Sequence, residues 1–345
     1  MHRTLKAVFL KGYIEVASSL GLEPYAILNG ANIDPRWLEE PQHSLSVGSI
    51  VRVFDESARL SGRDDFGLIL ARHRTFSSIG PVALLLQHEP TVRDFLDAVM
   101  KYRTVLEEAI WISVDEVGSV ATIRWELMSV SSSVQLMDYI LAASRTILGE
   151  ASDGAWRPSV AHFRRSIPKH LRSFERHFEC RLEFNDGFDG LTCPLSALDI
   201  KIPSADPTLA GHARQLLDMK PELRTDPPVT DYVRNAVRLL VHGGPPTLDR
   251  VAVTLGLSPR SVQRRLASEG QSFESILNET RRELALLHIE SSDRSITQIA
   301  ADTGFSSLSS FERWFKAQFA ISPMRWRKVH GGDEHRTSFA ASSTR

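Results

Sequence analysis

Two stretches near the C-terminal end of this 345-residue sequence share one layout, in which a short capped helix, a turn and a second helix follow one another. In the first stretch, residues 247–269, Thr247 is a suitable N-cap and Gly256 permits a tight turn. Ser258 and Pro259 then form a cap and first-turn pair that opens the next helix. The spacing predicts a helix-turn-helix unit.

The same layout recurs in residues 295–319. Ser295 to Thr303 is a short capped helix, Gly304 makes the turn, and Ser306 to Phe319 is the second helix. A repeated layout favours a shared function over chance, so we expect two helix-turn-helix units.

A continuous amphipathic pattern over residues 272–290 predicts one long helix between the two units. A helix of this length spans about 28 Å at ~1.5 Å per residue. That length is comparable with the roughly 34 Å between successive major-groove faces on one side of DNA. Its candidate inward-facing residues are Phe273, Ile276, Leu277, Leu284, Leu287 and His288.

The second helix of the first unit separates into two faces at 100° per residue. Val262 and Leu266 lie on one side and are expected to pack inward. The other side is rich in arginine and glutamine, the side chains that make bidentate contacts with guanine and adenine edges. A solvated surface helix would look similar, and the repeat favours DNA contact. The predicted DNA-binding residues are Arg260, Ser261, Gln263, Arg264 and Arg265.

The second helix of the second unit has Phe311 and Phe315 on its inner side. Its outer side is polar, with Lys316 placed where it could reach a phosphate. Leu308 could touch a thymine methyl group or pack against the protein. The predicted DNA-binding residues are Ser306, Ser309, Ser310, Arg313 and Lys316.

The first two-thirds of the chain mixes helical and strand-like patterns, which predicts an α+β domain. Residues 110–114 and 121–127 alternate as an antiparallel hairpin, with Asp115 to Gly118 as its turn. Extended runs are expected at 160–163 and 182–184, and helical segments at 6–28, 45–60, 134–148 and 168–178.

Proline content and patterning divide the chain. We expect a sensing and dimerisation domain at residues 1–220, a proline-rich linker at 221–229, an all-α domain with two helix-turn-helix units joined by a long helix at 230–330, and a disordered tail at 331–345.

Composition excludes several classes of protein. The sequence is 42% hydrophobic and 24% charged, within the range of globular proteins. Its longest apolar stretches, such as Val82 to Leu86, cannot cross a bilayer, and charged residues interrupt the first twenty positions, so we expect a soluble, cytoplasmic protein. Residues 230–330 carry 14 basic against 10 acidic side chains, whereas the remainder carries 27 against 32, so the C-terminal third is the basic part.

An enzymatic or metal site finds little support in the sequence. No phosphate-binding glycine loop, nucleophile elbow or pair of histidines on one helix turn is present, which predicts no catalytic residues and no cofactor. Cys180 and Cys193 fit neither a disulfide framework nor a common zinc spacing. His177 and Cys180 are expected on one helix face, but two ligands alone are more often coincidence, so no metal is predicted. A DNA-repair methyltransferase attached to such a domain would need a reactive cysteine motif that is missing here.

The C-terminal pattern closely resembles the DNA-binding domain of the AraC/XylS family of bacterial transcription regulators. The resemblance covers residues 228–330 and is carried by LGLSPRSVQRRLASEGQSF, RRELALLHI and SITQIAADTGFSSLSSFERWFKAQFAISPMRWR. It implies that Arg260, Gln263 and Arg264 read bases in the first unit and that Ser309 and Arg313 do so in the second. It also implies double-stranded promoter DNA as a partner and favours activation over repression, with RNA polymerase as the further partner of an activator.

Residues 6–210 are similar to the arabinose-binding-type N-terminal domain of ornithine-utilisation and virulence-surface regulators. The similarity rests on LSGRDDFGLILARHRTFSSIGPVALLLQHEPTVRDFLDAV, WRPSVAHFRRSIP and FNDGFDGLTCPLSALDIKIPSADP. It implies a homodimer and a small-molecule effector, with a protein partner as the alternative. Residues of the predicted hairpin that are candidates to line an effector pocket are Trp111, Arg124, Trp125 and Glu126.

Overall fold

The chain divides into two compact units, residues 1–225 and 226–345, in the computed structural model. The structure describes residues 4–107, 109–127, 133–218, 229–241, 244–255, 257–291 and 294–330. The predicted tail at 331–345 and most of the predicted linker at 221–229 lie outside these residues.

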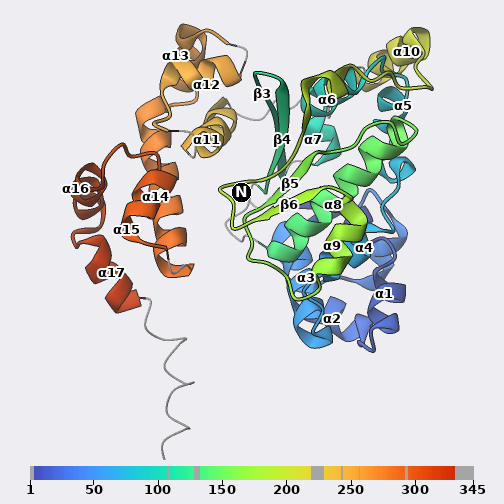
Figure 1. Ribbon diagram of the computed structural model, residues 1–345, viewed down its shortest axis with the longest axis horizontal. Coiled ribbons are helices and arrows are strands. Elements are labelled where there is room, and N and C mark those ends of the chain that lie inside the picture. The colour runs from blue at the N-terminus through green and yellow to red at the C-terminus, as the bar shows by residue number, and fades with distance from the viewer. Residues whose placement is uncertain are drawn as a thin grey trace, which may run out of the picture. The chain divides into compact units, whose positions relative to one another are not determined.

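The first unit is a mixed α+β domain (Figure 1). Its first half contains β1 (Thr4–Lys6), η1 (Ala7–Leu10), α1 (Tyr13–Ser19), α2 (Pro24–Gly30), η2 (Pro35–Glu39), β2 (Ser44–Ser46), α3 (Val47–Ser61), α4 (Phe66–Ala71), η3 (Phe76–Ile79), α5 (Ala83–Leu86), α6 (Val92–Lys101) and α7 (Arg103–Leu106). Its second half contains β3 (Ile110–Val117), β4 (Val120–Leu127), α8 (Val134–Ala151), β5 (Val160–Phe163), α9 (Leu171–Phe178), β6 (Arg181–Phe184), β7 (Asp189–Pro194), η4 (Leu195–Asp199) and α10 (Pro207–Asp218).

The main sheet has the strand order β3-β4-β7-β5-β6. All its neighbours are antiparallel except β5 and β6, which are parallel. In the β3–β4 hairpin, Ile112 pairs with Trp125 and Ser113 pairs with Arg124. Because side chains alternate along a strand, Ile112 and Trp125 lie on the opposite face of the sheet from Ser113 and Arg124. The Ile112 and Trp125 face is the one that meets the helices of the core.

Helix α8 is the central helix of this core and is buried on most of its circumference. It contacts β4 and β7 on one side and α3 and α4 on another. Gly67 of α4 makes the closest approach, because an added Cβ would lie 1.9 Å from the Gln135 carbonyl oxygen. The Gln135 side chain accepts a hydrogen bond from the Gly67 N–H at 2.9 Å and donates one to the Asp64 carbonyl at 3.0 Å. A side chain at position 67 would therefore separate the two helices.

Local differences from the sequence prediction have physical reasons. The hairpin turn was placed too early at Asp115 to Gly118, because β3 continues to Val117. The Asp115 carboxylate lies 3.3 Å from the Arg124 guanidinium across the hairpin, which favours pairing over a turn. Strand β7 was not predicted, although it pairs with both β4 and β5.

The helical second unit contains α11 (Val229–Leu240), α12 (Leu248–Thr254), α13 (Pro259–Ser268), α14 (Phe273–Ser291), α15 (Ile296–Asp302), α16 (Leu308–Phe319) and α17 (Pro323–His330). We call α12 with α13 the first helix pair and α15 with α16 the second helix pair. Figure 1 shows α14 running from one pair to the other. Leu287, predicted to face inward, is 40% exposed, and Ala285 and Ile289 occupy the buried positions beside it.

Two separate hydrophobic clusters share α14. The first cluster joins α11, α12, α13 and the first half of α14 through Val233, Val262, Leu266 and Ile276. The second joins the last half of α14 to the second helix pair and α17. Each helix pair therefore has a core of its own, and α14 belongs to both.

The Arg281 side chain fixes the turn of the second helix pair to α14. Its guanidinium donates hydrogen bonds to the carbonyl oxygens of Thr303 at 3.1 Å and Gly304 at 2.9 Å, and lies 4.2 Å from the centre of the Phe305 ring. The backbone of Gly304 has φ 73°, and an added Cβ would lie 2.9 Å from Pro246 Cδ. This turn therefore requires glycine for both its backbone angle and its packing.

Among the described residues, no helix is both long enough and apolar enough to cross a membrane.

Candidate nucleic-acid interface and ligand cavity

Side-chain hydrogen bonds at the N-caps define where both helices of the first helix pair begin. The Thr247 hydroxyl accepts from the Arg250 N–H at 3.3 Å, and the Ser258 hydroxyl accepts from the Ser261 N–H at 3.2 Å. Pro259 occupies the first turn of α13. The Leu257 N–H donates to the Ala252 carbonyl at 2.9 Å and so holds the connection between the helices. Gly256, predicted as the turn residue, lies outside the described residues.

Helix α13 buries one side and exposes an arginine-rich side. Val262 and Leu266 are fully buried. The outward residues Arg260, Gln263, Arg264 and Arg265 are all exposed. Ser261 is half-buried, and its hydroxyl lies 2.8 Å from the Ser258 hydroxyl. Four of the five residues predicted to contact DNA here therefore have exposed side chains, whereas Ser261 takes part in the helix cap.

The second helix pair begins with a capping box, in which the Ser295 hydroxyl accepts from the Gln298 N–H and the Gln298 side chain accepts from the Ser295 N–H. Helix α16 starts at Leu308 with Ser307 as its N-cap, two residues later than predicted. Ser306 is therefore exposed in the turn that precedes the helix.

Helix α16 also separates into a buried and an exposed side. Phe311 and Phe315 are fully buried in an aromatic cluster with Trp314 and Phe319. The outward residues Ser309, Arg313 and Lys316 are exposed, as is Leu308 at 36%. Ser310 is half-buried, its N–H donating to the Ser307 hydroxyl at 3.3 Å. Ser310 therefore supports the helix start more than it offers an outer contact.

The exposed faces of the two helices differ in charge. Helix α13 presents three arginines, and the first acid that follows, Glu269, accepts hydrogen bonds from the N–H groups of Val229 at 2.6 Å and Thr230 at 2.8 Å. Helix α16 presents Arg313 and Lys316 together with the exposed Glu312. The exposed face of α13 therefore carries more net positive charge than that of α16.

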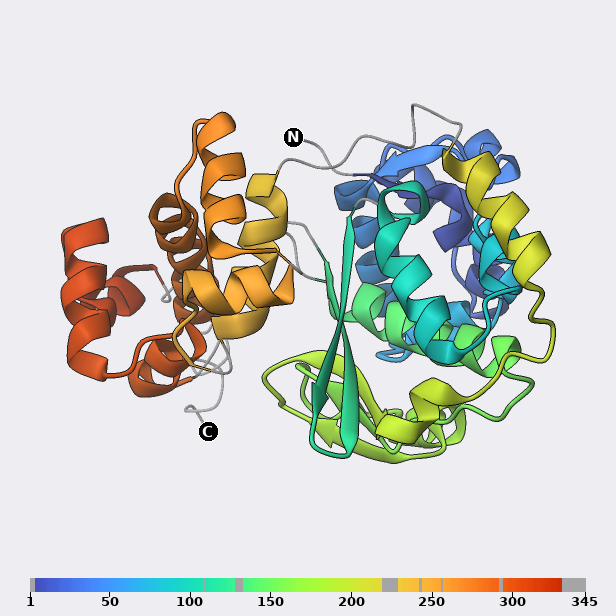
Figure 2. The same ribbon diagram turned by 90° about the horizontal axis from the view of Figure 1, so that it is seen from above.

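An apolar cavity of about 120 Å³ lies within the first unit. Its walls come from α6, α7, the β3–β4 hairpin and α8, and Figure 2 shows α6 beside this hairpin. The apolar lining includes Phe95, Leu96, Val99, Ile112, Trp125 and Ile147. The walls of this cavity are therefore mainly apolar.

Charged side chains interrupt this lining in one region. Arg74 is 7% exposed and its Nη2 lies 4.0 Å from Glu107 Oε1. Burial raises the pKa of Glu107 to about 7, against the opposing effects of the Arg74 charge and the Lys6 N–H, which donates to Glu107 Oε2 at 3.1 Å. Arg103, which also lines the cavity, lies with its guanidinium 4.5 Å from the centre of the Trp111 ring.

The hairpin residues proposed as pocket candidates divide between the two faces of the sheet. Trp125 lines the cavity. Trp111, Arg124 and Glu126 lie on the opposite face, where the Arg124 guanidinium lies 4.4 Å from the Phe188 ring centre. Arg74, Arg103 and Glu107 were not predicted, because no local pattern in the sequence marks charged residues that converge from separate segments.

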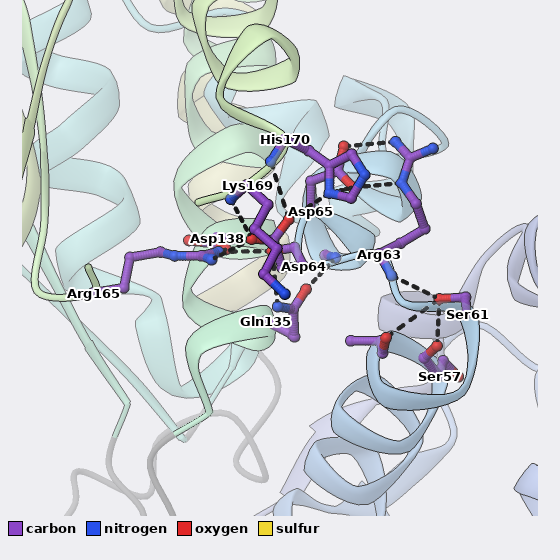
Figure 3. A network of polar contacts seen from close by, with 12 residues as sticks. Ser57, Ser61, Arg63, Asp64, Asp65, Gln135, Asp138, Arg165, Lys169 and His170 are labelled. Carbon is purple, nitrogen blue, oxygen red and sulfur yellow. Dashed lines mark hydrogen bonds and ion pairs between the residues drawn. The ribbon is translucent and has the colours of Figure 1, made fainter. Parts of the chain in front are cut away.

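A cluster formed by Asp64, Asp65 and His170 has the residue types of a cation site, with ligand atoms within 4.8 Å of one another (Figure 3). Its atoms are already engaged. Asp64 accepts from the N–H groups of Lys169 and His170 and from the His170 ring, and Asp65 accepts twice from Arg63 at 2.8 Å. These bonds tie the segment before α4 to the segment before α9, which is a structural role.

His177 and Cys180 do not share a helix face as predicted, because α9 ends at Phe178 and Glu179 adopts a left-handed conformation. The His177 ring donates to the Ala142 carbonyl at 3.0 Å. Burial raises the pKa of the Cys180 thiol to about 11, which disfavours the thiolate that a metal would need.

Comparison with known proteins finds a matching domain family for each of the two units. Residues 21–202 match the family described as the arabinose-binding domain of AraC transcription regulator, N-term, and residues 251–329 match a helix-turn-helix domain. The HTH-type transcriptional regulator VirS of Mycobacterium tuberculosis is 26% identical over 333 residues, which cover 95% of this chain and 97% of VirS. The ornithine utilization regulator of Pseudomonas aeruginosa is 22% identical, with 93% and 95% covered. The crystal structure of transcriptional regulator CdpR from Pseudomonas aeruginosa aligns with 88% of this chain and 97% of its own at 21% identity and a TM-score of 0.43.

An arabinose-binding-type domain and a helix-turn-helix domain in one chain define a class of two-part transcription regulators. The chain belongs to the AraC family of these regulators.

Proposed function

We propose that this protein is a sequence-specific DNA-binding transcription activator whose two helix pairs are two helix-turn-helix units that read adjacent major-groove segments. The observation that carries the proposal is the exposed face of α13, where Arg260, Gln263 and Arg264 project opposite the buried Val262 and Leu266. A helix fixed by its apolar side and free on an arginine- and glutamine-rich side suits base-edge contact in the major groove.

In the second unit, Ser309 and Arg313 are the proposed base readers and Lys316 the proposed phosphate contact. Helix α14, with 19 residues, joins the two helix pairs and has about the length that one helical turn of DNA requires. Because each pair packs on its own hydrophobic cluster, both reading helices keep a defined orientation relative to α14.

The first unit is proposed to bind a small-molecule effector and to form the homodimer, with RNA polymerase as the further partner in activation. The apolar cavity supports a small-molecule effector over a protein partner, because small-molecule sites are concave and mostly apolar. The names of the relatives, transcriptional regulators and a transcriptional activator, support a role in transcription regulation.

A gel-shift titration of the full chain on the DNA upstream of its own operon tests this function. We expect binding to that DNA to be at least 100-fold tighter than binding to a shuffled sequence of equal composition at physiological salt, as specific regulators typically achieve ~10³-fold or more. Equal affinity for the two sequences would refute sequence-specific reading. The double variant Arg260→Ala, Arg264→Ala is the matched loss-of-reading control.

A further inference from the structure

Two charged side chains in the lining of the first unit's cavity, Arg74 and Glu107, are already partnered within the protein. The Arg74 guanidinium donates a hydrogen bond to the Tyr139 hydroxyl, and its Nη2 lies 4.0 Å from Glu107 Oε1. The other carboxylate oxygen of Glu107 accepts a hydrogen bond from the Lys6 N–H at 3.1 Å. Arg74 and Glu107 therefore do not require a charged ligand to balance them.

Arg103 is the third charged side chain of this lining. It is 5% exposed, and its guanidinium lies 4.5 Å from the centre of the Trp111 ring, a cation–π contact. A cationic ligand would lie near the guanidinium groups of Arg74 and Arg103, and an anionic ligand would compete with Glu107 for Arg74. Either ion would also lose its hydration in an apolar space. The cavity therefore disfavours ligands of both charges.

The remaining lining offers few polar groups and little space. Apart from the charged residues, the polar side-chain atoms of the lining belong to Tyr139, Ser144 and Trp125. A sugar would bury several hydroxyl groups without partners here, which is unfavourable. An apolar cavity of ~150 Å³ in a protein admits benzene, so the space of about 120 Å³ here suits an apolar group of about one six-membered ring.

We propose that the effector is an uncharged, mainly apolar molecule whose buried part is about the size of one six-membered ring, held between α6, α8 and the β3–β4 hairpin. This inference rests on the proposed effector-sensing role and names the chemical class of the ligand. Phe95 of α6, Ile147 of α8 and Trp125 of the hairpin contact the ring.

The experiment is isothermal titration of the full chain with four single-ring probes that differ in charge. Toluene and benzyl alcohol are neutral, benzoate is an anion and benzylamine is a cation at pH 8. This pH lies above the Glu107 pKa of about 7, so Glu107 is ionised beside Arg74. We expect each neutral probe to bind at least tenfold more tightly than both ions, because only the ions lose the hydration of a charge. L-Arabinose should bind at least tenfold more weakly than benzyl alcohol.

Variants of the lining show whether the probes occupy this cavity. Ala143→Phe fills the cavity from α8 and should abolish binding of toluene. Ala26→Phe, at an exposed alanine of α2, is the matched control and should bind toluene as the wild type does. Ile147→Ala enlarges the cavity and should raise the affinity for naphthalene at least tenfold, which keeps the test decisive if Ala143→Phe does not fold.

Several results would overturn the inference. They are binding of benzoate, benzylamine or L-arabinose as tight as that of benzyl alcohol, no binding of either neutral probe, toluene binding that survives in folded Ala143→Phe, and an unchanged naphthalene affinity in Ile147→Ala.

Failure here is distinguishable from failure of the proposed function. A chain that binds its promoter DNA specifically but neither neutral probe contradicts only the ligand chemistry. A chain that binds toluene in the cavity but does not discriminate promoter from shuffled DNA contradicts only the DNA-reading role.

Discussion

Arg264 and Arg265 are adjacent on α13, yet they are expected to contribute to DNA binding in different ways. Both are exposed, and successive residues are turned by about 100° around a helix. Arg264 is turned by about 40° from Arg260, on the side opposite the buried Val262 and Leu266, whereas Arg265 lies at the flank. We therefore expect Arg264 to meet base edges and Arg265 to meet the phosphate backbone.

The magnitudes follow from these two roles. Losing a bidentate base contact costs about 1–3 kcal/mol, or roughly 5- to 150-fold in affinity for the preferred sequence. Losing one phosphate contact lowers the slope of log K against log salt by about 0.9, so the affinity deficit of the variant shrinks about 3.5-fold between 50 and 200 mM salt. Arg264→Ala should therefore relax base preference at one position, while Arg265→Ala should weaken all sequences alike with a shallower salt dependence.

Binding isotherms on the operator and on its single-base variants, measured at several salt concentrations, decide between these outcomes. Glu269 should not pair with either arginine and so should not affect the comparison of the two variants, because its carboxylate accepts hydrogen bonds from the two N–H groups at the start of α11. Full base preference in the Arg264→Ala variant would refute the assignment of this reading face. A steeper or unchanged salt slope in the Arg265→Ala variant would refute the phosphate assignment.

Three further predictions concern stability and assembly. Glu269→Ala removes the acceptor for two N–H groups of α11 and should cost about 1 kcal/mol of unfolding free energy at pH 7 in calorimetry. Burial raises the pKa of Glu269, but the hydrogen bonds from the α11 backbone outweigh it and hold the pKa below its usual value. This stabilisation should therefore be present above the usual glutamate pKa and shrink as the pH falls through the lower folded-state pKa; a difference that does not shrink at all on acidification would contradict the cap. Gly304 and Gly270 both have a left-handed backbone, so alanine at either position should lower the free energy of unfolding by about 1–2 kcal/mol. Gly304→Ala should lower it further, because of the two positions only 304 is crowded by a neighbouring atom. Equal losses on thermal unfolding would contradict the packing account. Light scattering should give the mass of a dimer for the full chain, and a strict monomer at high concentration with and without operator DNA would refute dimerisation by the first unit.

Local features of the fold were predictable from the sequence because their causes are local. Thr247, Ser258 and Ser295 cap helices through hydrogen bonds that reach only three residues along the chain, and all three caps are present. The buried positions Val262 and Phe311 follow from helical periodicity alone. The family resemblance rested on the same short-range pattern and is confirmed by the matched domains.

Features that depend on tertiary contacts were not predictable. Glu269 caps a helix whose first residue is Val229, and Arg281 donates to the turn at Gly304, so neither contact has a local signature. The cavity shows this more clearly, because Arg74 follows α4 and Glu107 follows α7, and the two meet only in the folded domain. Trp125 could be assigned to a face of the hairpin from its alternation, but not to a cavity.

Hydroxyl-radical footprinting of the full chain on its operator tests the central claim most directly. If both helix pairs read DNA, each bound protomer should protect two segments about 10 base pairs apart on one face of the duplex. Arg264→Ala should weaken protection of one segment, and Arg313→Ala should weaken protection of the other. A single protected segment that survives both substitutions, or uniform protection without defined segments, would contradict the account.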